Sequence, residues 1–231
     1  MTPAGWYGKL PALGDFASRR LSPGFVETWD AWLQRGLAAS QSELGADWLE
    51  RYLTSHVWHF VLHPGVVGNE AWVGIVMSSV DRVGRYFPLT ICTAIEAPGD
   101  SVGWDKLESW LDALEVAARS VLDVDAELDI FEGTLTGLPL SDLGASVATD
   151  AQHFSESLIA GTERTTLPPI RAVGVQPMVE TLAFSLNSVA MRGMSLWWCR
   201  DTADGLGGFV HRGLPQPALF TNMYSYSPAN T

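Results

Sequence analysis

The sequence predicts an α/β protein with a largely antiparallel or mixed sheet, folded as a single domain over residues 1–231. Three strand-like runs follow one another closely, at residues 56–63, 71–78 and 87–96. Because connections this short cannot cross over between parallel strands, these runs are expected to pair antiparallel. Amphipathic helical patterns precede and follow the block, so helices are available to cover both faces of the sheet.

The composition indicates a compact globular protein, since 47% of the 231 residues are hydrophobic and 17% are charged. A formal net charge of -12 argues against binding to nucleic acid phosphates or to an anionic membrane. The N-terminus lacks the pattern of a signal peptide, and no stretch is apolar enough to span a membrane, so we expect a cytoplasmic protein. Cys92 and Cys199 lie in apolar strand-like runs. We expect both to be reduced and buried.

The N-terminal residues 5–16 are expected to form a short strand that leads into a loop punctuated by glycine and proline. Gly8 and Lys9 suggest a phosphate-binding loop. The glycine spacing is wrong, however, and Leu10 occupies the position where such a loop has a magnesium-binding Ser or Thr. We therefore reject a phosphate-binding loop.

Two helices are predicted next. The first should begin at Pro23 with Ser22 as its N-cap. The sequence SQSE at residues 40–43 has the form of a capping box and predicts the start of a second helix. The expected apolar faces of these helices are formed by Phe25, Trp29, Trp32, Leu33 and Leu37, and by Leu44, Trp48, Leu49 and Tyr52.

The strand-like run at residues 56–63 places His59 and His63 on one face. A zinc site needs a third ligand, and none follows at a recognisable spacing. We therefore expect hydrogen-bonded histidines and no metal.

The second half of the chain is less regular. Apolar residues at spacings of three and four from Trp104 to Val121 predict a long helix, and residues 125–133 predict a short one. Residues 134–177 are rich in turn formers, which predicts an irregular excursion over the surface. Residues 178–191 are helix-like. A strand pair is expected at residues 195–200 and 208–212.

Charged residues of both signs gather in the loop between the second and third strand-like runs. Asp81, Arg82 and Arg85 lie there between two apolar stretches. Two interpretations remain open at this point. The loop is either an ion-paired turn that fixes the hairpin, or a functional loop held by rigid strands.

Three segments resemble the TagF family, also called ImpM, which comprises accessory proteins of bacterial type VI secretion. They are GKLPALGDF at residues 8–16, SSVDRVGRYFPLT at residues 78–90 and SLWWCR at residues 195–200. The resemblance covers most of residues 5–130 and, more loosely, residues 190–222. It implies a three-layer α/β/α arrangement.

The resemblance also implies a function. It points to a cytoplasmic accessory factor that restrains type VI secretion after translation. We expect no cofactor. Its partners would be secretion components, and in some relatives the forkhead-associated scaffold protein takes part. Such a protein would act by covering a partner's surface, through exposed aromatic side chains on an acidic molecule.

The alternative is an enzyme that binds an anionic small molecule or a nucleotide through Asp81, Arg82 and Arg85. The two arginines could hold a phosphate group, although Asp81 would oppose its charge. The sequence has no nucleophile elbow, dinucleotide-binding fingerprint, HExxH or CxxC motif. We therefore favour a protein that is not an enzyme.

Two charged segments are expected to meet at one end of the sheet. Asp15 and Arg19 follow the first strand, and the charged loop follows a later one. We predict that Asp15 or Asp81 bonds to Arg85. In this arrangement Arg85 has a structural role, while Arg82 is exposed.

Overall fold

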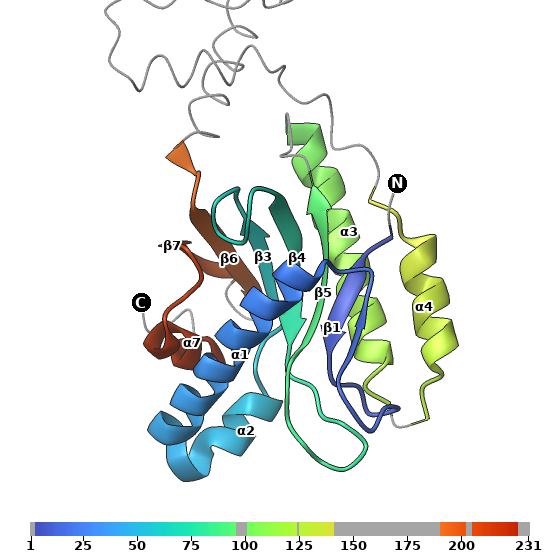
Figure 1. Cartoon of the computed structure of the whole chain (residues 1–231), viewed down its shortest axis with the longest axis vertical. Coiled ribbons are helices and arrows are strands. Elements are labelled where there is room, and N and C mark those ends of the chain that lie inside the picture. The colour runs from blue at the N-terminus through green and yellow to red at the C-terminus, as the bar shows by residue number, and fades with distance from the viewer. Residues whose placement is uncertain (1–2, 96–100, 124, 141–189, 202–204, 226–231) are drawn as a thin grey trace, which may run out of the picture.

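The computed structural model describes residues 3–95, 101–123, 125–140, 190–201 and 205–225. Within these residues the chain forms a seven-stranded sheet with the order β2-β1-β5-β4-β3-β6-β7 (Figure 1). All neighbouring strands are antiparallel, which confirms the predicted α/β class and strand pairing. The strands are β1 (Gly5–Gly8), β2 (Ala17–Arg19), β3 (Trp58–Leu62), β4 (Ala71–Met77), β5 (Leu89–Ile95), β6 (Met194–Asp201) and β7 (Gly205–Arg212).

The central strand β4 is buried along its whole length. Its side chains alternate between two hydrophobic clusters, so the strand is apolar on both faces, as is typical of a strand covered on both sides. Gly74 is required at its midpoint, because a Cβ atom there would lie 2.2 Å from the carbonyl oxygen of Ile91 on β5.

Different helices pack on the two faces of the sheet. Val73 and Ile75 face the helices α3 (Ser101–Ser120) and α4 (Leu128–Gly137). Trp72 and Val76 face the opposite cluster, to which α1 (Pro23–Leu44), α2 (Trp48–Leu53) and α7 (Pro217–Tyr224) contribute (Figure 1). The predicted helix before Val121 is confirmed as α3. Its buried side includes Leu107, Leu111, Leu114 and Ala118.

The start of α1 is confirmed, since the Ser22 hydroxyl accepts a hydrogen bond from the Phe25 N–H at 3.4 Å.

The predicted capping box at residues 40–43 is wrong. α1 continues through it to Leu44, and a short 3-10 helix (Gly45–Asp47) then leads into α2. The Ser40 hydroxyl is buried, and it accepts a hydrogen bond from Trp48 Nε1 at 2.9 Å and donates one to the Leu37 carbonyl. This tertiary contact uses the hydroxyl group that would otherwise cap a helix.

The chain after residue 190 returns to the sheet and extends it beyond β3, with which β6 pairs. The predicted C-terminal strand pair is confirmed and is longer than expected. The predicted short helix is α4, which begins and ends later than expected, so residues 134–137 are helical. Most of the predicted irregular region, and the predicted helix at residues 178–191 up to residue 189, lie outside the described residues.

Both cysteines are buried and reduced, as expected. Cys92 lies on β5 and Cys199 on β6, in the cluster that faces α1. Within the described part of the chain, no helix has both the length and the apolar character needed to cross a membrane.

Candidate functional site

The carboxylate of Asp81 is the centre of a polar network at one end of the sheet. Its side chain has no exposed surface. Its two oxygens accept hydrogen bonds from the Val83 N–H at 3.0 Å, the Arg85 N–H at 2.9 Å, Arg85 Nε at 2.6 Å and Lys9 Nζ at 2.9 Å. The Asp81 N–H in turn donates to the Arg85 carbonyl at 3.0 Å. The turn at residues 81–85 is therefore closed around its own aspartate.

The environment of Asp81 changes its acidity. Burial alone would raise the pKa of the carboxyl group. The hydrogen bonds from the Arg85 N–H, Lys9, the Arg85 side chain and the Val83 N–H outweigh burial and hold the pKa well below its usual range. Asp81 is therefore an acceptor fixed in its charged form.

Lys9 reaches this carboxylate from the loop after β1. Its side chain is 5% exposed, and its Nζ lies 4.7 Å from the centre of the Phe16 ring as well as 2.9 Å from Asp81. The Lys9 ammonium group is therefore held between a carboxylate and an aromatic ring, with little contact with solvent. The sequence suggested only phosphate binding for Lys9 and did not reveal that it is the partner of Asp81.

Arg85 joins the two loops directly. Its Nη2 donates to the carbonyl of Gly14 at 2.5 Å, while the Arg82 N–H donates to the carbonyl of Leu13 at 3.1 Å. Gly8, at the end of β1, lies so close to the second loop that a Cβ atom would be 2.1 Å from the Pro88 carbonyl oxygen. The segments at residues 8–16 and 78–90 thus form one structural unit, at the lower end of the sheet in Figure 1.

The unit is anchored to α2 through Tyr52. The Tyr52 hydroxyl donates to the Ser79 carbonyl at 2.8 Å and accepts from the Ser79 N–H at 3.0 Å. The Ser79 hydroxyl donates to the Lys9 carbonyl at 2.7 Å. Ser79 is therefore a buried structural residue between α2 and the first loop.

The other residues proposed for this site lie differently. Asp15 is exposed, and its carboxylate accepts a hydrogen bond from the neighbouring Phe16 N–H, so Asp81 rather than Asp15 bonds to Arg85. Arg19 lies on β2, where its guanidinium donates to the Ser18 carbonyl, and it takes no part in the Asp81 network.

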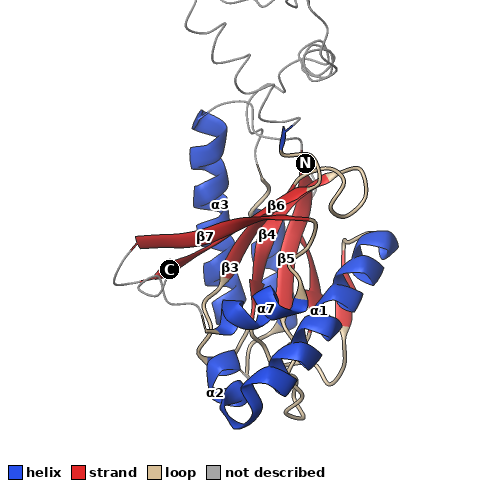
Figure 2. Cartoon of the chain, turned by 90° about the vertical axis from the view of Figure 1, so that its left-hand side faces the viewer, coloured by secondary structure: helices blue, strands red, loops and turns tan. Residues whose placement is uncertain are grey.

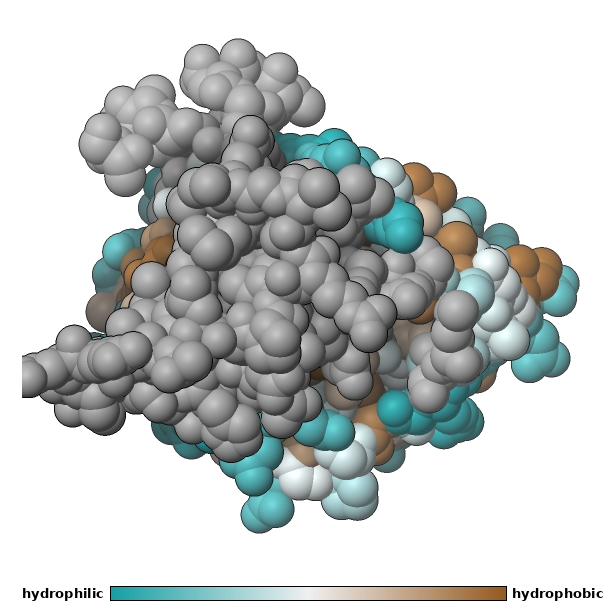
Figure 3. Space-filling view, turned by 90° about the horizontal axis from the view of Figure 1, so that it is seen from above, coloured by the Kyte–Doolittle hydropathy of each residue, from teal (hydrophilic) through white to brown (hydrophobic). Residues whose placement is uncertain are grey.

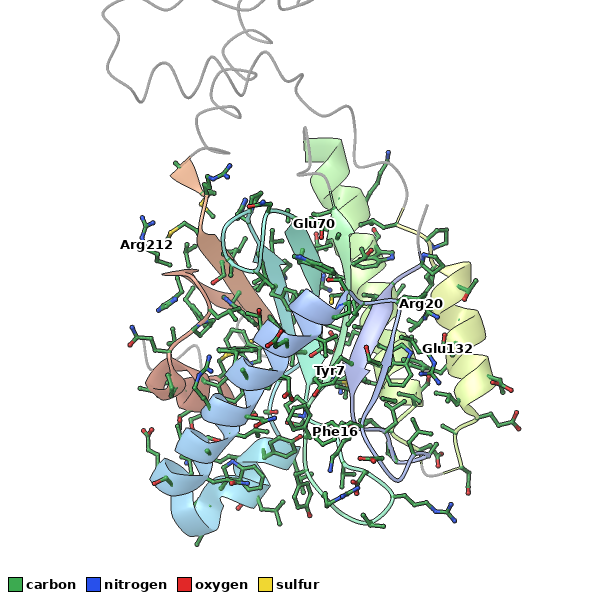
Figure 4. The ribbon with its side chains drawn as sticks, viewed as in Figure 1. Tyr7, Phe16, Arg20, Glu70, Glu132 and Arg212 are labelled. Carbon is green, nitrogen blue, oxygen red and sulfur yellow. The ribbon has the colours of Figure 1, made fainter. Side chains whose placement is uncertain are left out.

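The neighbouring Arg20 has a role that the sequence did not reveal. It forms an ion pair with Glu132 of α4, and Trp6 Nε1 donates to the same carboxylate at 2.6 Å (Figure 4). This contact attaches α4 to β1 and to the residue that follows β2.

Three side chains at the end of the sheet where the two loops meet face solvent. Arg82 is exposed, Val83 is 68% exposed and Phe16 is 45% exposed. Phe16 still packs edge-on against Phe87, with ring centres 4.7 Å apart, so its ring is held in place. In Figure 4 it lies at the loop end, below Tyr7. Figure 3 shows the opposite end of the molecule, where hydrophobic and hydrophilic residues lie side by side around the visible rim.

The two histidines on one side of the first strand-like run have different positions in the fold. His59 is buried, and its Nε2 lies 3.1 Å from a carboxylate oxygen of Glu115 on α3. His63 follows the end of β3. Among the described residues, no group of three potential metal ligands comes together.

Comparison with known proteins identifies the family. The sequence model of the TagF N-terminal domain, described as type VI secretion system-associated, matches residues 5–138. No protein with a curated description matches the chain. The crystal structure of PA0076 from Pseudomonas aeruginosa PAO1 is similar, with a TM-score of 0.74 and 38% sequence identity over 96% of this chain and 93% of that chain.

The predicted resemblance is thus confirmed. The match to the family model includes both loops that meet at Asp81, and the likeness to PA0076 continues beyond residue 138, because it covers 96% of this chain. The chain belongs to the TagF family of type VI secretion system-associated proteins.

Proposed function

We propose that this protein is a cytoplasmic regulator of type VI secretion that restrains the system after translation through contacts with other proteins. We infer a three-layer α/β/α arrangement, in which helices cover the two faces of the sheet. The loops at the ends of the strands then provide exposed surface for a partner. The partner to test first is the forkhead-associated scaffold protein that the family resemblance implies.

The observation that supports a binding role over catalysis is the internal pairing of Asp81. Its oxygens already accept four hydrogen bonds from Lys9, Val83 and Arg85. A phosphate group bound to Arg85 would compete with Asp81 for the guanidinium, and it would bring a second anion next to a buried carboxylate. The network therefore suits a rigid loop better than a site for an anionic substrate.

A cavity near the loops gives no support to the enzyme alternative. It has a volume of about 20 Å³ and is lined by Ser55, His56, Ser78 and Tyr224, together with apolar side chains. This space accommodates about one water molecule, whereas small-molecule sites usually measure about 300–1,000 Å³.

The exposed part of the unit has the properties of a protein contact. Arg82, Val83 and Phe16 project from loops whose backbone is fixed by buried hydrogen bonds. Arginine and aromatic residues are common among the residues that dominate binding energy. Fixed loops lose little conformational entropy when they bind. The net charge of -12 would in addition steer the molecule toward basic surfaces on a partner.

The test compares two arginine variants in the native host after deletion of the gene. Arg82→Ala removes the exposed side chain of the loop, and Arg35→Ala removes an exposed arginine from α1 as a matched control. We expect cells without the gene to secrete more, and we expect the wild type and Arg35→Ala to restore the restraint. Arg82→Ala should fail to restore it and should capture less of the scaffold protein, with an unchanged melting temperature. Full restraint by Arg82→Ala would contradict the proposed surface.

A further inference from the structure

The two edges of the sheet differ in length. One edge is β2, which has only three residues. The other edge is β7, which has eight residues and pairs with β6 along its whole length. No strand among the described residues pairs with the outer side of β7, which faces the viewer in Figure 2. Within the described part of the chain, its outer backbone groups therefore have no strand partner, and an edge of this kind can pair with another strand.

β7 lacks the features that usually protect a long edge strand. Its sequence, GLGGFVHR, contains neither proline nor lysine, and its register with β6 has no extra residue and hence no bulge. Val210 is 51% exposed on the face that it shares with Leu196. Arg212 is the only charged residue of the strand, and it lies at its end.

We propose that β7 is the interface of a homodimer, in which the β7 strands of two copies pair antiparallel and join both sheets into one. A two-fold axis perpendicular to the sheet keeps the faces of the two sheets aligned. With the axis at Phe209, Val210 of each copy lies opposite Gly208 of the other copy, on the same face.

This register brings large side chains next to a glycine. Gly208 must be a glycine, because a Cβ atom would lie 2.4 Å from the Trp197 carbonyl oxygen. The half-buried Trp198 of β6 is the neighbour of Gly208 in the ladder. The side chain of Val210 from the second copy can therefore extend over Gly208 toward the Trp198 ring, and packing between β-branched and aromatic side chains on one face stabilises a sheet.

The charges fit this arrangement too. The antiparallel pairing places Arg212 of the two copies at opposite ends of the junction, so the arginines do not face each other. Two copies that each carry a net charge of -12 repel one another at long range. Because salt screens this repulsion, the dimer should become tighter as the salt concentration rises.

The experiment is sedimentation velocity of the full-length protein from low to high micromolar concentration, at low and at physiological salt. The test variant is Val210→Lys, which adds the charge that natural edge strands use against pairing. The matched control is Val116→Lys on α3, where the valine is 70% exposed. The wild type and the control should dimerise with increasing concentration, and Val210→Lys should raise the dimer dissociation constant at least about tenfold.

Hydrogen exchange of the β7 amides at the same concentrations provides a second readout. The protection of these amides should increase with concentration in the wild type and in Val116→Lys, and not in Val210→Lys. A wild type that remains monomeric throughout would overturn the proposal, and protected β7 amides in that monomer would show that another part of the chain covers the edge. Equal dimerisation of Val210→Lys and the wild type would overturn it as well.

Discussion

Lys9 donates a hydrogen bond to Asp81 across 2.9 Å, although 72 residues separate them in the sequence. Both side chains are almost completely buried. This contact explains in physical terms why the segments GKLPALGDF and SSVDRVGRYFPLT belong together. The lysine of the first neutralises the aspartate of the second, and the loop carbonyls of the first receive hydrogen bonds from the arginine residues of the second.

Replacement of Lys9 by methionine should destabilise the protein strongly. The variant keeps the apolar stem of the side chain but leaves the buried Asp81 carboxylate without its buried cation. Loss of one partner of a buried ion pair is costly because the remaining charge stays desolvated. We expect the melting temperature to fall by at least about 5 °C in differential scanning calorimetry. An unchanged melting temperature would show that water or Arg85 replaces the lysine.

Arg85→Ala should have a smaller effect than Lys9→Met. The Arg85 side chain is 53% exposed, so water can replace part of its contact with Asp81, whereas the Lys9 site is closed to solvent. Arg82→Ala should alter the free energy of unfolding by less than about 0.5 kcal/mol, as at most exposed positions. Chemical denaturation of the three variants tests this ranking, and a variant at Arg82 that is less stable than the one at Arg85 would contradict it.

Gly8→Ala should separate the two loops, because its Cβ atom would lie 2.1 Å from the Pro88 carbonyl oxygen at a backbone φ of +142°. An alanine is strained at this φ, and the contact forces the backbone apart, so we expect a loss of about 1–3 kcal/mol of stability. Gly14→Ala is the control from the same loop, since nothing lies within 4 Å of its Cβ position. Urea denaturation should show Gly14→Ala close to the wild type. Equal effects of the two substitutions would show that contact with Pro88 is not the cause.

The periodic patterns of the sequence were sufficient to predict most helices and strands, because α1, α3 and the central strands bury continuous apolar faces. The prediction of a capping box at residues 40–43 was wrong because of a tertiary contact. Local chemistry allowed a cap at Ser40, but the indole of Trp48 uses the Ser40 hydroxyl inside an uninterrupted helix. A local pattern does not contain that information.

The candidate site could be predicted only in part for a similar reason. The ion pair between Asp81 and Arg85 joins residues only four positions apart, so it could be predicted from the sequence. Lys9 follows a four-residue strand, and nothing in its local sequence separates a buried lysine from a solvated one. The carboxylate of a loop residue such as Asp15 can accept a hydrogen bond from the adjacent backbone N–H. The sequence does not show whether such a residue forms this local bond or an ion pair.

Glu115 should contribute to stability above acidic pH. The hydrogen bond with His59 lowers the pKa of its carboxyl group from 4.5 to about 2, against the opposing effect of burial and with the help of Arg119. A lowered pKa means that this contribution is complete above the unfolded-state value and is lost as the pH falls from about 4.5 to about 2. Glu115→Gln should therefore lose less stability than the wild type between these pH values. Parallel acid-denaturation curves for both proteins would contradict this role.

The region that the family model matches ends at residue 138. Residues after 190 complete the core of the earlier part. Trp197 is fully buried and packs against the rings of Trp29 and Trp32, and β6 covers the edge of β3. The indole of Trp32 also donates to the carbonyl of Pro215 at 2.8 Å.

A fragment of residues 1–138 would expose these rings and leave β3 as an unprotected edge, so it should aggregate or bind a hydrophobic dye. The full chain should instead unfold in one calorimetric transition, as a single domain. A soluble fragment with a cooperative melting curve and a native near-UV circular dichroism spectrum would show that the N-terminal region is a domain of its own. Because β6 lies inside the sheet between β3 and β7, we expect the opposite: the seven strands fold as one cooperative unit.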